Sequence, residues 1–180
     1  MKKYLKTALI LFVICAAAAL LLAVFNSVTA PKISAYEAEQ KTAALKNVSG
    51  GASIGEYVIV PEGSMVNGYY TLDNGGYILN LTANGYGGPI ILVASYSADG
   101  ILRAAQVISN SETPGLGKKS EESWYMDKFI GKGQNMPIKK TSLSDSDAQA
   151  VSGASMTFTG ISKALLAGSN FVATLDGGKN

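Results

Sequence analysis

The stretch GYYTLDNGGYILNLTA, residues 68–83, decides the fold, because it places two β-rich segments around DNGG, a hairpin turn signal. A second β-rich pair follows, PIILVASYS (89–97) and ILRAAQVI (101–108), with ADG between its two segments. The short β-rich segment EYVIVPEG (56–63) precedes the first pair. We therefore expect an antiparallel meander between Glu56 and Ile108.

The carboxy-terminal part of the chain carries helical signals instead. SEESWYMDKFIG (120–131) starts with the cap-like Ser120 and predicts a short helix with Trp124 and Phe129 on its buried side. TFTGISKALLAGSNFVATL (157–175) predicts a second helix packed on the sheet, from the spacing of Ile161, Leu165, Leu166, Ala167 and Phe171. Strands followed by helices predict an α+β domain, an antiparallel sheet with packed helices.

The amino terminus has the pattern of a membrane anchor. Lys2, Lys3 and Lys6 precede an uncharged run of 18 residues, Ala8–Phe25. As a helix, this run would span roughly 27 Å at about 1.5 Å per residue, close to the thickness of a bilayer core. The lysines favour a cytoplasmic amino terminus, which would place the rest of the chain outside the membrane.

A cleaved signal peptide is the alternative, since Val28 and Ala30 in SVTAPK form a small-residue cleavage pattern. We favour a retained anchor, because the apolar run exceeds the roughly 7–15 residues of a signal core and Pro31 would follow the cut directly. Pro31 is expected to break or restart the helix. An amphipathic helix from about Ser34 to Lys46 should then lead away from the membrane, followed by a flexible joint at SGGASIG (49–55).

These signals divide the chain into three expected parts. Residues 1–33 form a cytoplasmic stub and a transmembrane helix, residues 34–50 form a helical linker, and residues 51–180 form an extracytoplasmic domain. The 180-residue chain is long enough for one such domain with its own core and an appendage.

Composition excludes several classes of function. The formal charge is only +2 and no basic run is interleaved with aromatic residues, so nucleic-acid binding is not expected. The chain has no histidine, which removes imidazole bases and the commonest metal ligand. Cys15 is the single cysteine, so neither a disulfide framework nor a thiolate metal cluster can form within the chain. A redox role would therefore need an organic cofactor.

The stretch SETPGLGKK (111–119) is a first candidate for chemistry. Its proline and two glycines rule out a regular element, and the glycines would let the backbone approach a flat ligand closely. An ordinary surface loop remains the simpler interpretation of its composition. The candidate ligand-contacting residues of this loop are Glu112, Thr113, Pro114, Gly115, Leu116 and Gly117.

The stretch VSGASMTFTG (151–160) is a second candidate. Gly153 and Ala154 have almost no side chain, so a bulky group could lie against the backbone there. A helix that begins there would offer free N–H groups and its positive dipole end to a phosphate, with Ser155 and Thr157 beside it. A capped helix start without a ligand has the same composition, and both interpretations stay open on composition alone.

SGASMT (152–157) resembles the flavinylation motif of covalent FMN-binding domains, whose pattern is Asp-x-x-(Ser/Thr)-Gly-Ala-(Thr/Ser). In that family the final hydroxyl carries FMN through a phosphoester bond. The last four positions of the pattern match Ser152, Gly153, Ala154 and Ser155. The resemblance therefore implies covalent FMN on Ser155.

The match departs from the family pattern at two places. Gln149 occupies the position of the motif's Asp, although Asp145 and Asp147 are close by. The acceptor, Ser155, is a serine where threonine is more usual. Thr157 is the nearest alternative acceptor in the chain.

A second resemblance covers the rest of the chain. ETPGLG (112–117) resembles the loop that precedes a helix with Trp and Phe in the G subunit of Rnf complexes, and Trp124 and Phe129 fit that continuation. The same subunit is similar at GYGGPI (85–90), ADGIL (98–102) and NSVTAPKI (26–33). The C subunit of sodium-pumping quinone reductases shares the domain but is usually longer, so this chain more closely resembles the Rnf subunit.

The resemblance implies a membrane-anchored electron-transfer subunit whose domain at residues 51–180 binds FMN. Rnf complexes couple electron transfer between ferredoxin and NAD to pumping of Na⁺ or H⁺. The implied partners are the lipid bilayer, a flavin transferase that attaches FMN, and the other membrane and cytoplasmic subunits of the complex. The flavin would carry the redox chemistry, so no catalytic acid or base is expected from the chain itself.

The same resemblance assigns roles within the two candidate stretches. The ETPGLG loop would pack on the isoalloxazine, and the backbone of Ser152–Ser155 would hold the phosphate end. No acidic residue lies within the apolar run, so the chain is not expected to conduct the ion alone. Two alternatives stay open, namely a stand-alone extracytoplasmic flavoprotein and an unflavinylated assembly subunit.

Overall fold

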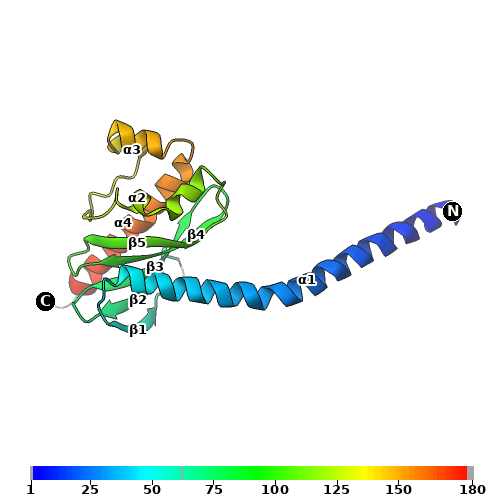
Figure 1. Cartoon of the computed structure of the whole chain (residues 1–180), viewed down its shortest axis with the longest axis horizontal. Coiled ribbons are helices and arrows are strands. Elements are labelled where there is room, and N and C mark those ends of the chain that lie inside the picture. Colours follow the sequence, from blue (N-terminus) through cyan, green and yellow to red (C-terminus); the bar gives the residue numbers. More distant parts are fainter. Residues whose placement is uncertain (1, 62, 178–180) are drawn as a thin grey trace. The chain divides into compact units, whose positions relative to one another are not determined.

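The structure is a computed structural model that describes residues 2–61 and 63–177. The chain divides into two compact units between Glu39 and Gln40. The larger unit is built on a five-stranded antiparallel sheet, in which each strand pairs with the next one along the chain (Figure 1). Its strands are β1 (Ile54–Ile59), β2 (Val66–Leu72), β3 (Tyr77–Asn84), β4 (Pro89–Tyr96) and β5 (Leu102–Ser109).

The two predicted hairpins are confirmed, and their turns explain why they form. In the DNGG turn, Gly75 has φ +80° and its N–H donates to the Leu72 carbonyl at 3.0 Å. In the ADG turn, Gly100 has φ +78° and its N–H donates to the Ser97 carbonyl at 2.9 Å. Glycine adopts these positive φ angles at little cost, so each turn is set locally by its sequence.

Helix α4 (Ser155–Gly177) covers one face of the sheet, as its apolar spacing predicts. The Tyr96 hydroxyl of β4 donates to the Leu165 carbonyl of α4 at 2.9 Å, and burial raises the pKa of this phenol. Apolar side chains from α4, the strands and the segment after β5 share one core cluster, which includes Leu79, Leu92, Phe129, Phe158 and Ile161.

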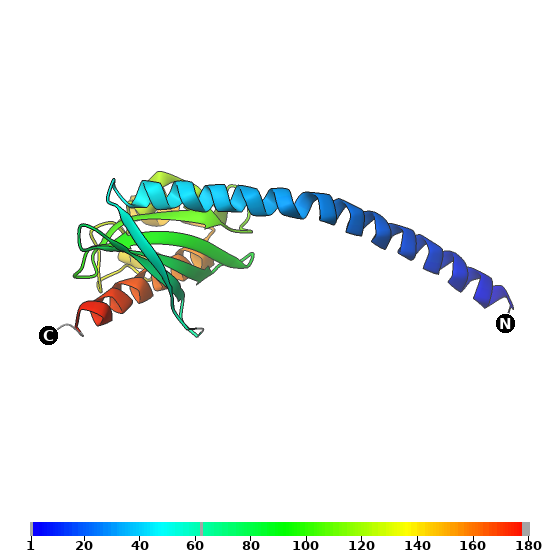
Figure 2. The same cartoon turned by 90° about the horizontal axis from the view of Figure 1, so that it is seen from below.

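The opposite face of the sheet is covered by the last turns of helix α1 (Lys2–Val48) that belong to the larger unit, as Figure 2 shows. Ala44 and Val48 are buried there in a second, smaller cluster with residues of β2, β3 and β4. The sheet therefore lies between two helices, and the α+β class predicted from the sequence is confirmed.

Helix α1 contradicts the expected break at Pro31, because it continues through that residue. A proline inside a helix removes one backbone hydrogen bond, whereas a break would leave several N–H and C=O groups unpaired at two new ends. Beside the proline, the Ser34 hydroxyl donates to the Ala30 carbonyl at 3.0 Å and the Ser27 hydroxyl donates to the Val24 carbonyl at 2.8 Å. The helix expected from Ser34 to Lys46 is thus a continuation of α1.

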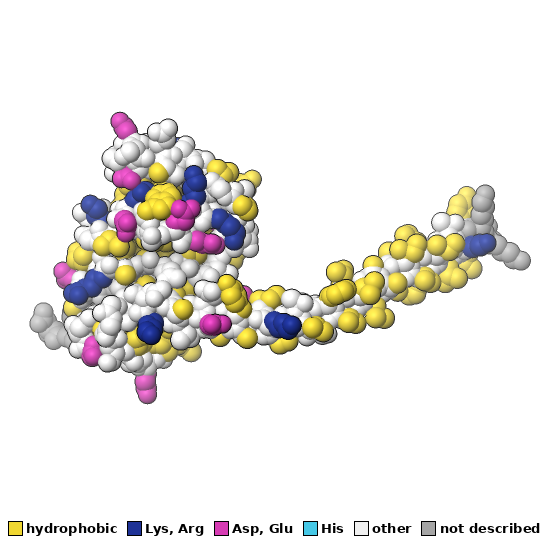
Figure 3. Space-filling view, in the orientation of Figure 1, with side chains coloured by type: hydrophobic (Ala, Val, Ile, Leu, Met, Phe, Trp, Pro, Cys, Tyr) yellow, Lys and Arg dark blue, Asp and Glu magenta, His cyan; other side chains and the backbone are white. Residues whose placement is uncertain are grey.

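The amino-terminal part of α1 is long and apolar enough to cross a membrane. Its side chains from residue 4 to residue 29 are exposed, and Figure 3 shows hydrophobic side chains along this part of the helix. This arrangement is consistent with a membrane anchor, because such a surface is stable in lipid rather than in water.

The segment after β5 differs from the single short helix expected at residues 120–131. It forms a 3₁₀ helix η1 (Gly117–Glu121) and a one-turn helix α2 (Ser123–Met126), separated by Glu122 in an extended conformation. Ser120 does not cap a helix, because it is buried inside η1, which has already begun at Gly117. Phe129 is fully buried as predicted, while Trp124 is only partly buried against the core.

Candidate cofactor site

A cavity of about 460 Å³ lies in the larger unit where three segments meet: the β3–β4 loop, the loop after β5 and the first turn of α4. It brings together the two stretches selected from the sequence, residues 112–117 and residues 152–157, which are far apart in the chain. Its lining consists of Tyr86, Glu112, Thr113, Leu116, Gly117, Gly153, Ala154, Ser155, Met156 and Thr157.

Most of the residues predicted for the site contribute to this lining, and three do not. Ser152, Pro114 and Gly115 are exposed and lie outside the cavity wall. Two lining residues, Tyr86 and Met156, received no role from the sequence, although both lie inside stretches that resemble family motifs. The two residues are 74% and 60% exposed, so their side chains are accessible at the edge of the cavity.

Glu112 is the buried polar group at the centre of the site, with only 3% of its surface exposed. Its Oε1 accepts a hydrogen bond from the Gly87 N–H at 2.7 Å, and its Oε2 accepts one from the Thr157 hydroxyl. The Asn110 side chain accepts from the Glu112 N–H at 2.9 Å and so fixes the backbone of the loop. One carboxylate therefore joins all three segments that form the cavity.

Two glycines make room for this carboxylate, and a third makes room for the backbone next to it. A side chain at Gly117 would place its Cβ 2.7 Å from the Glu112 Cβ and 2.9 Å from the Thr157 Oγ1. A Cβ at Gly85 would meet the Glu112 Oε1, and a Cβ at Gly87 would meet the Ser111 carbonyl oxygen. Gly117 is thus needed for packing inside the protein itself, a role that the sequence did not indicate.

The start of α4 arranges its two hydroxyls differently. Ser155 is the first residue of the helix and is exposed, whereas Thr157 is 1% exposed and donates its hydroxyl proton to Glu112. Gly153, directly before the helix, has φ +86° and its Cβ position would lie 2.9 Å from the Leu116 Cδ2. Since the first N–H groups of an α-helix have no intrahelical partners, this end of α4 offers donors beside Ser155.

Ser155 also borders a second hollow of about 410 Å³ on the other side of the helix start. Asn84, Thr159 and Lys163 contribute polar atoms to it, and Met65, Met156 and Gly160 complete its wall. Ser155 and Met156 therefore line both hollows, and both residues are exposed.

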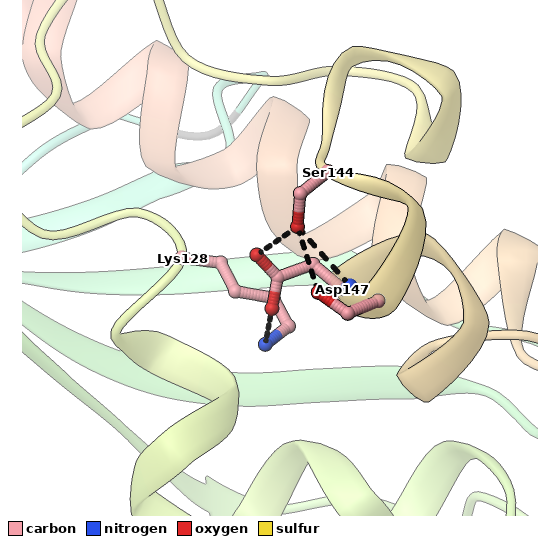
Figure 4. Close-up of polar contacts among 4 residues, drawn as sticks. Lys128, Ser144 and Asp147 are labelled. Carbon is pink, nitrogen blue, oxygen red and sulfur yellow. Dashed lines mark hydrogen bonds and ion pairs between the residues drawn. The ribbon is translucent and has the colours of Figure 1, made fainter.

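The acidic residues near the motif's Asp position belong to a short helix that the sequence did not predict, α3 (Asp145–Ala150). Asp147 accepts a hydrogen bond from the Lys128 Nζ at 2.8 Å and one from the Ser144 hydroxyl at 2.9 Å (Figure 4). The Lys128 hydrogen bond, followed by that from Ser144, lowers the pKa of the Asp147 carboxyl. The Ser144 oxygen also accepts from the Asp147 N–H, so the pattern Ser-x-x-Asp caps α3 and was the signal for it.

Of the two carboxylates near the position of the motif's Asp, one is therefore already engaged by other side chains. Gln149 is exposed, and Asp147 is committed to Lys128 and Ser144. Asp145 is exposed at the first position of α3.

Comparison with known proteins agrees with this architecture. Residues 85–168 match the family of FMN-binding domains, and residues 1–48 match the RnfG N-terminal region. The chain is 34% identical to the G subunit of the Na(+)-translocating ferredoxin:NAD(+) oxidoreductase complex of Acetobacterium woodii, over 92% of this chain and 87% of that protein. It is 30% identical to the G subunit of the ion-translocating oxidoreductase complex of Methanosarcina acetivorans, over 98% of both chains.

The fold and these matches define a class of protein, a subunit with an FMN-binding domain behind an amino-terminal apolar helix. The chain belongs to the family of G subunits of Rnf ion-translocating oxidoreductase complexes. It is accordingly part of a multisubunit complex, and the family resemblance noted in the sequence is confirmed.

Proposed function

We propose that this chain carries FMN covalently on Ser155 and serves as an electron-transfer subunit of an Rnf-type complex. One observation carries the proposal: a single cavity joins the exposed Ser155 at the start of α4 to the loop at residues 112–117. The two stretches resemble family motifs independently and are distant in the chain, and the cavity that they share offers the space for a ligand that a helix cap and a surface loop do not require.

The residues around this cavity fit a flavin nucleotide. Its volume of about 460 Å³ falls within the roughly 300–1,000 Å³ of small-molecule sites. Three of the lining residues, Gly117, Gly153 and Ala154, have no side chain or only a methyl group, which leaves the backbone accessible to a ligand. The start of α4 supplies N–H donors and a positive dipole end for a phosphate.

The proposed attachment to Ser155 rather than Thr157 follows from exposure and hydrogen bonding. An acceptor hydroxyl must be reached by the enzyme that modifies it, and Ser155 is exposed. Thr157 is buried, and its hydroxyl already donates to Glu112. Modification of Thr157 would therefore require this buried carboxylate to lose one of its two donors.

Each wall of the cavity would have its own task. The first turn of α4 would hold the phosphate, and the backbone at Gly117 with the side chain of Leu116 would contact the ring. Tyr86, exposed at the rim, would limit access of water to the ring. When bound, FMN supplies the redox chemistry, so the protein has only to bind, orient and shield it.

The proposed location follows from α1 and its flanking lysines. The apolar helix would anchor the chain in the cytoplasmic membrane as a single span, with the amino terminus in the cytoplasm and the domain outside. A covalent link would keep the flavin there whatever its free concentration. The proposed partners are the lipid bilayer, a flavin transferase and the membrane and cytoplasmic subunits of the complex.

The test is flavin attachment to the full-length chain, co-produced with a flavin transferase. Wild type should give a fluorescent band on a denaturing gel and an intact mass increased by that of FMN less one water, as a phosphoester requires. Ser155→Ala should give neither. Ser53→Ala is the matched control, because Ser53 is an exposed serine that lies outside both the motif and the cavity, and it should keep the flavin. Fluorescence that persists in Ser155→Ala and disappears in Thr157→Val would overturn the assignment of the acceptor.

A wild-type chain without the mass increase would instead support the alternative of an unflavinylated assembly subunit. The exposed Gln149 at the motif's Asp position is the feature that favours this alternative. A flavinylated chain that reduces an acceptor in the absence of any other subunit would support a stand-alone flavoprotein.

A further inference from the structure

The carboxylate of Glu112 is unusual among the charged groups of the described residues, because it is buried beside the cavity without a cationic partner. The ion pairs that the described residues form join Lys118 to Glu121 and Lys128 to Asp147, and neither includes Glu112. Its two acceptor oxygens are satisfied by one N–H and one O–H donor. Two such donors are typical of an ionised carboxylate, which can only accept.

Nearby groups respond to this negative charge. Burial raises the pKa of the Tyr125 phenol, and the charge of Glu112 raises it further. The Tyr125 hydroxyl has no hydrogen-bond partner among the described residues and is almost fully buried. The region around Glu112 is thus poorly solvated, a setting in which a charge acts strongly on its neighbours.

A cofactor in the cavity would lie against this charge, because Glu112 contributes to the cavity wall. Reduction adds negative charge to a flavin, and a nearby carboxylate in a medium of low dielectric constant opposes that addition. Charge placed close to the ring is one of the means by which a protein tunes the potential of its flavin.

We infer that Glu112 is a positioning residue that also lowers the reduction potential of the flavin held in this cavity. The inference rests on the proposed function, because it requires FMN at Ser155. By its bonds to Gly87 and Thr157, Glu112 holds the β3–β4 loop and the first turn of α4 together around the cofactor. By its charge, it favours the oxidised form.

Glu112→Gln separates these two roles. Glutamine keeps the volume and one carbonyl oxygen that can accept from the Gly87 N–H, and its NH₂ group can donate to the Thr157 oxygen. The link between the segments is therefore retained while the charge is removed. The flavin should become easier to reduce, by about tenfold in the equilibrium constant for the first electron, or about 59 mV for a one-electron couple.

Thr157→Val tests the inference independently of Glu112→Gln, because it should shift the reduction potential of the flavin in the opposite direction. It removes the O–H donor from the carboxylate while leaving the charge and nearly the same volume. The negative charge is then less compensated, so the flavin should become harder to reduce than in wild type. A purely structural role would loosen the site in both variants and would not shift the potential in opposite directions.

The experiment is a spectroelectrochemical titration of the flavinylated full-length chains in detergent. Glu56→Gln is the matched control, because Glu56 is an exposed carboxylate on β1 outside the cavity, and its potential should equal that of wild type. Equal potentials in wild type and Glu112→Gln, or a shift of the same sign in both variants, would overturn the inference. If Glu112→Gln takes up no flavin, a potential in Thr157→Val that is unchanged or more positive would overturn it.

The positioning role has a readout that needs no flavin. In the Ser155→Ala background, Thr157→Val should speed amide hydrogen exchange at Gly87, because the carboxylate that accepts its N–H is held less firmly. An unchanged rate of amide hydrogen exchange at Gly87 would overturn the positioning role of Glu112. A wild-type chain without FMN would refute the proposed function, whereas a flavinylated wild type with an unshifted Glu112→Gln would refute this inference alone.

Discussion

The starts of helices α3 and α4 combine the same two kinds of group, a hydroxyl and a carboxylate, to different effect. At α3, Ser144 and Asp147 lie near the surface, and Lys128 neutralises the carboxylate (Figure 4). At α4, Thr157 and Glu112 are buried and no cation of the described residues is paired with them. The first arrangement caps its helix beside a hollow of about 390 Å³. The second has no such ion pair among the described residues and lines the cavity of about 460 Å³ next to the exposed Ser155.

This difference separates a structural cap from a candidate site more sharply than composition does. A hydroxyl at a helix start is a cap by default. What distinguishes α4 is a carboxylate that comes from a distant segment, is buried and is left without a counter-charge. Such an arrangement costs stability and is expected where it serves binding or electron transfer rather than folding.

Gly117→Ala is expected to have the largest effect on stability and on flavin attachment at the start of α4. The new Cβ would lie 2.7 Å from the Glu112 Cβ and 2.9 Å from the Thr157 Oγ1, so the loop or α4 must move. We expect a loss of about 1–3 kcal/mol in the free energy of unfolding, together with loss of flavin attachment. Denaturant unfolding and intact mass would measure the two effects.

Gly115→Ala is the control for that prediction. Gly115 lies in the same loop with open space around its Cβ position, so only its positive φ of +75° resists the substitution. The cost should be about 1 kcal/mol, with flavin attachment retained. Equal loss of attachment in both variants would mean that the loop conformation, rather than room for Glu112, controls the site.

A smaller difference, in the free energy of unfolding, is expected between Thr157→Val at α4 and Ser144→Ala at α3. Thr157→Val leaves a buried carboxylate without one of its two donors and should cost about 1–3 kcal/mol in the free energy of unfolding. Ser144→Ala removes the cap of the exposed helix α3 and should cost about 1 kcal/mol. Chemical denaturation of both variants tests the ranking, and a larger loss in Ser144→Ala would contradict it.

These predictions depend on contacts that the sequence indicated only in part. The hairpins were predictable because Gly75 and Gly100 fix their turns locally, and α4 because its apolar spacing is regular. The continuation of α1 through Pro31 was not predictable in the same way. The expectation that a proline breaks a helix ignores the cost of creating two new helix ends. Ser120 failed as a cap because the 3₁₀ helix had already begun at Gly117.

The candidate site was predictable as two stretches but not as one network. Residues 112–117 and 152–157 were selected by glycines, hydroxyls and family motifs, and the cavity joins them. The bonds from Glu112 to Thr157 and Gly87 connect residues that are distant in the chain, and no local pattern encodes such pairs. Tyr86 gave a usable signal that was missed, an aromatic residue inside a glycine-rich loop that resembles a family motif.

The smallest effect is the dependence of stability on acid that Asp147 contributes at the start of α3. Hydrogen bonds from Lys128 and then Ser144 lower the pKa of Asp147, so its contribution is present above the unfolded pKa and is lost as the pH falls through the folded pKa, below about pH 4. Asp147→Asn should reduce the loss of stability in that window. Thermal unfolding from about pH 6 to about pH 3 measures it, and identical profiles for the variant and wild type would contradict this assignment.

The most direct test of the account is the intact mass of the full-length chain co-produced with a flavin transferase. The account predicts an increase by one covalently bound FMN in wild type and Ser53→Ala, and none in Ser155→Ala. It also predicts that the increase maps to the peptide that contains Ser155. A wild-type chain of unmodified mass, or an increase that persists in Ser155→Ala, would contradict the claim that the start of α4 is a flavin attachment site.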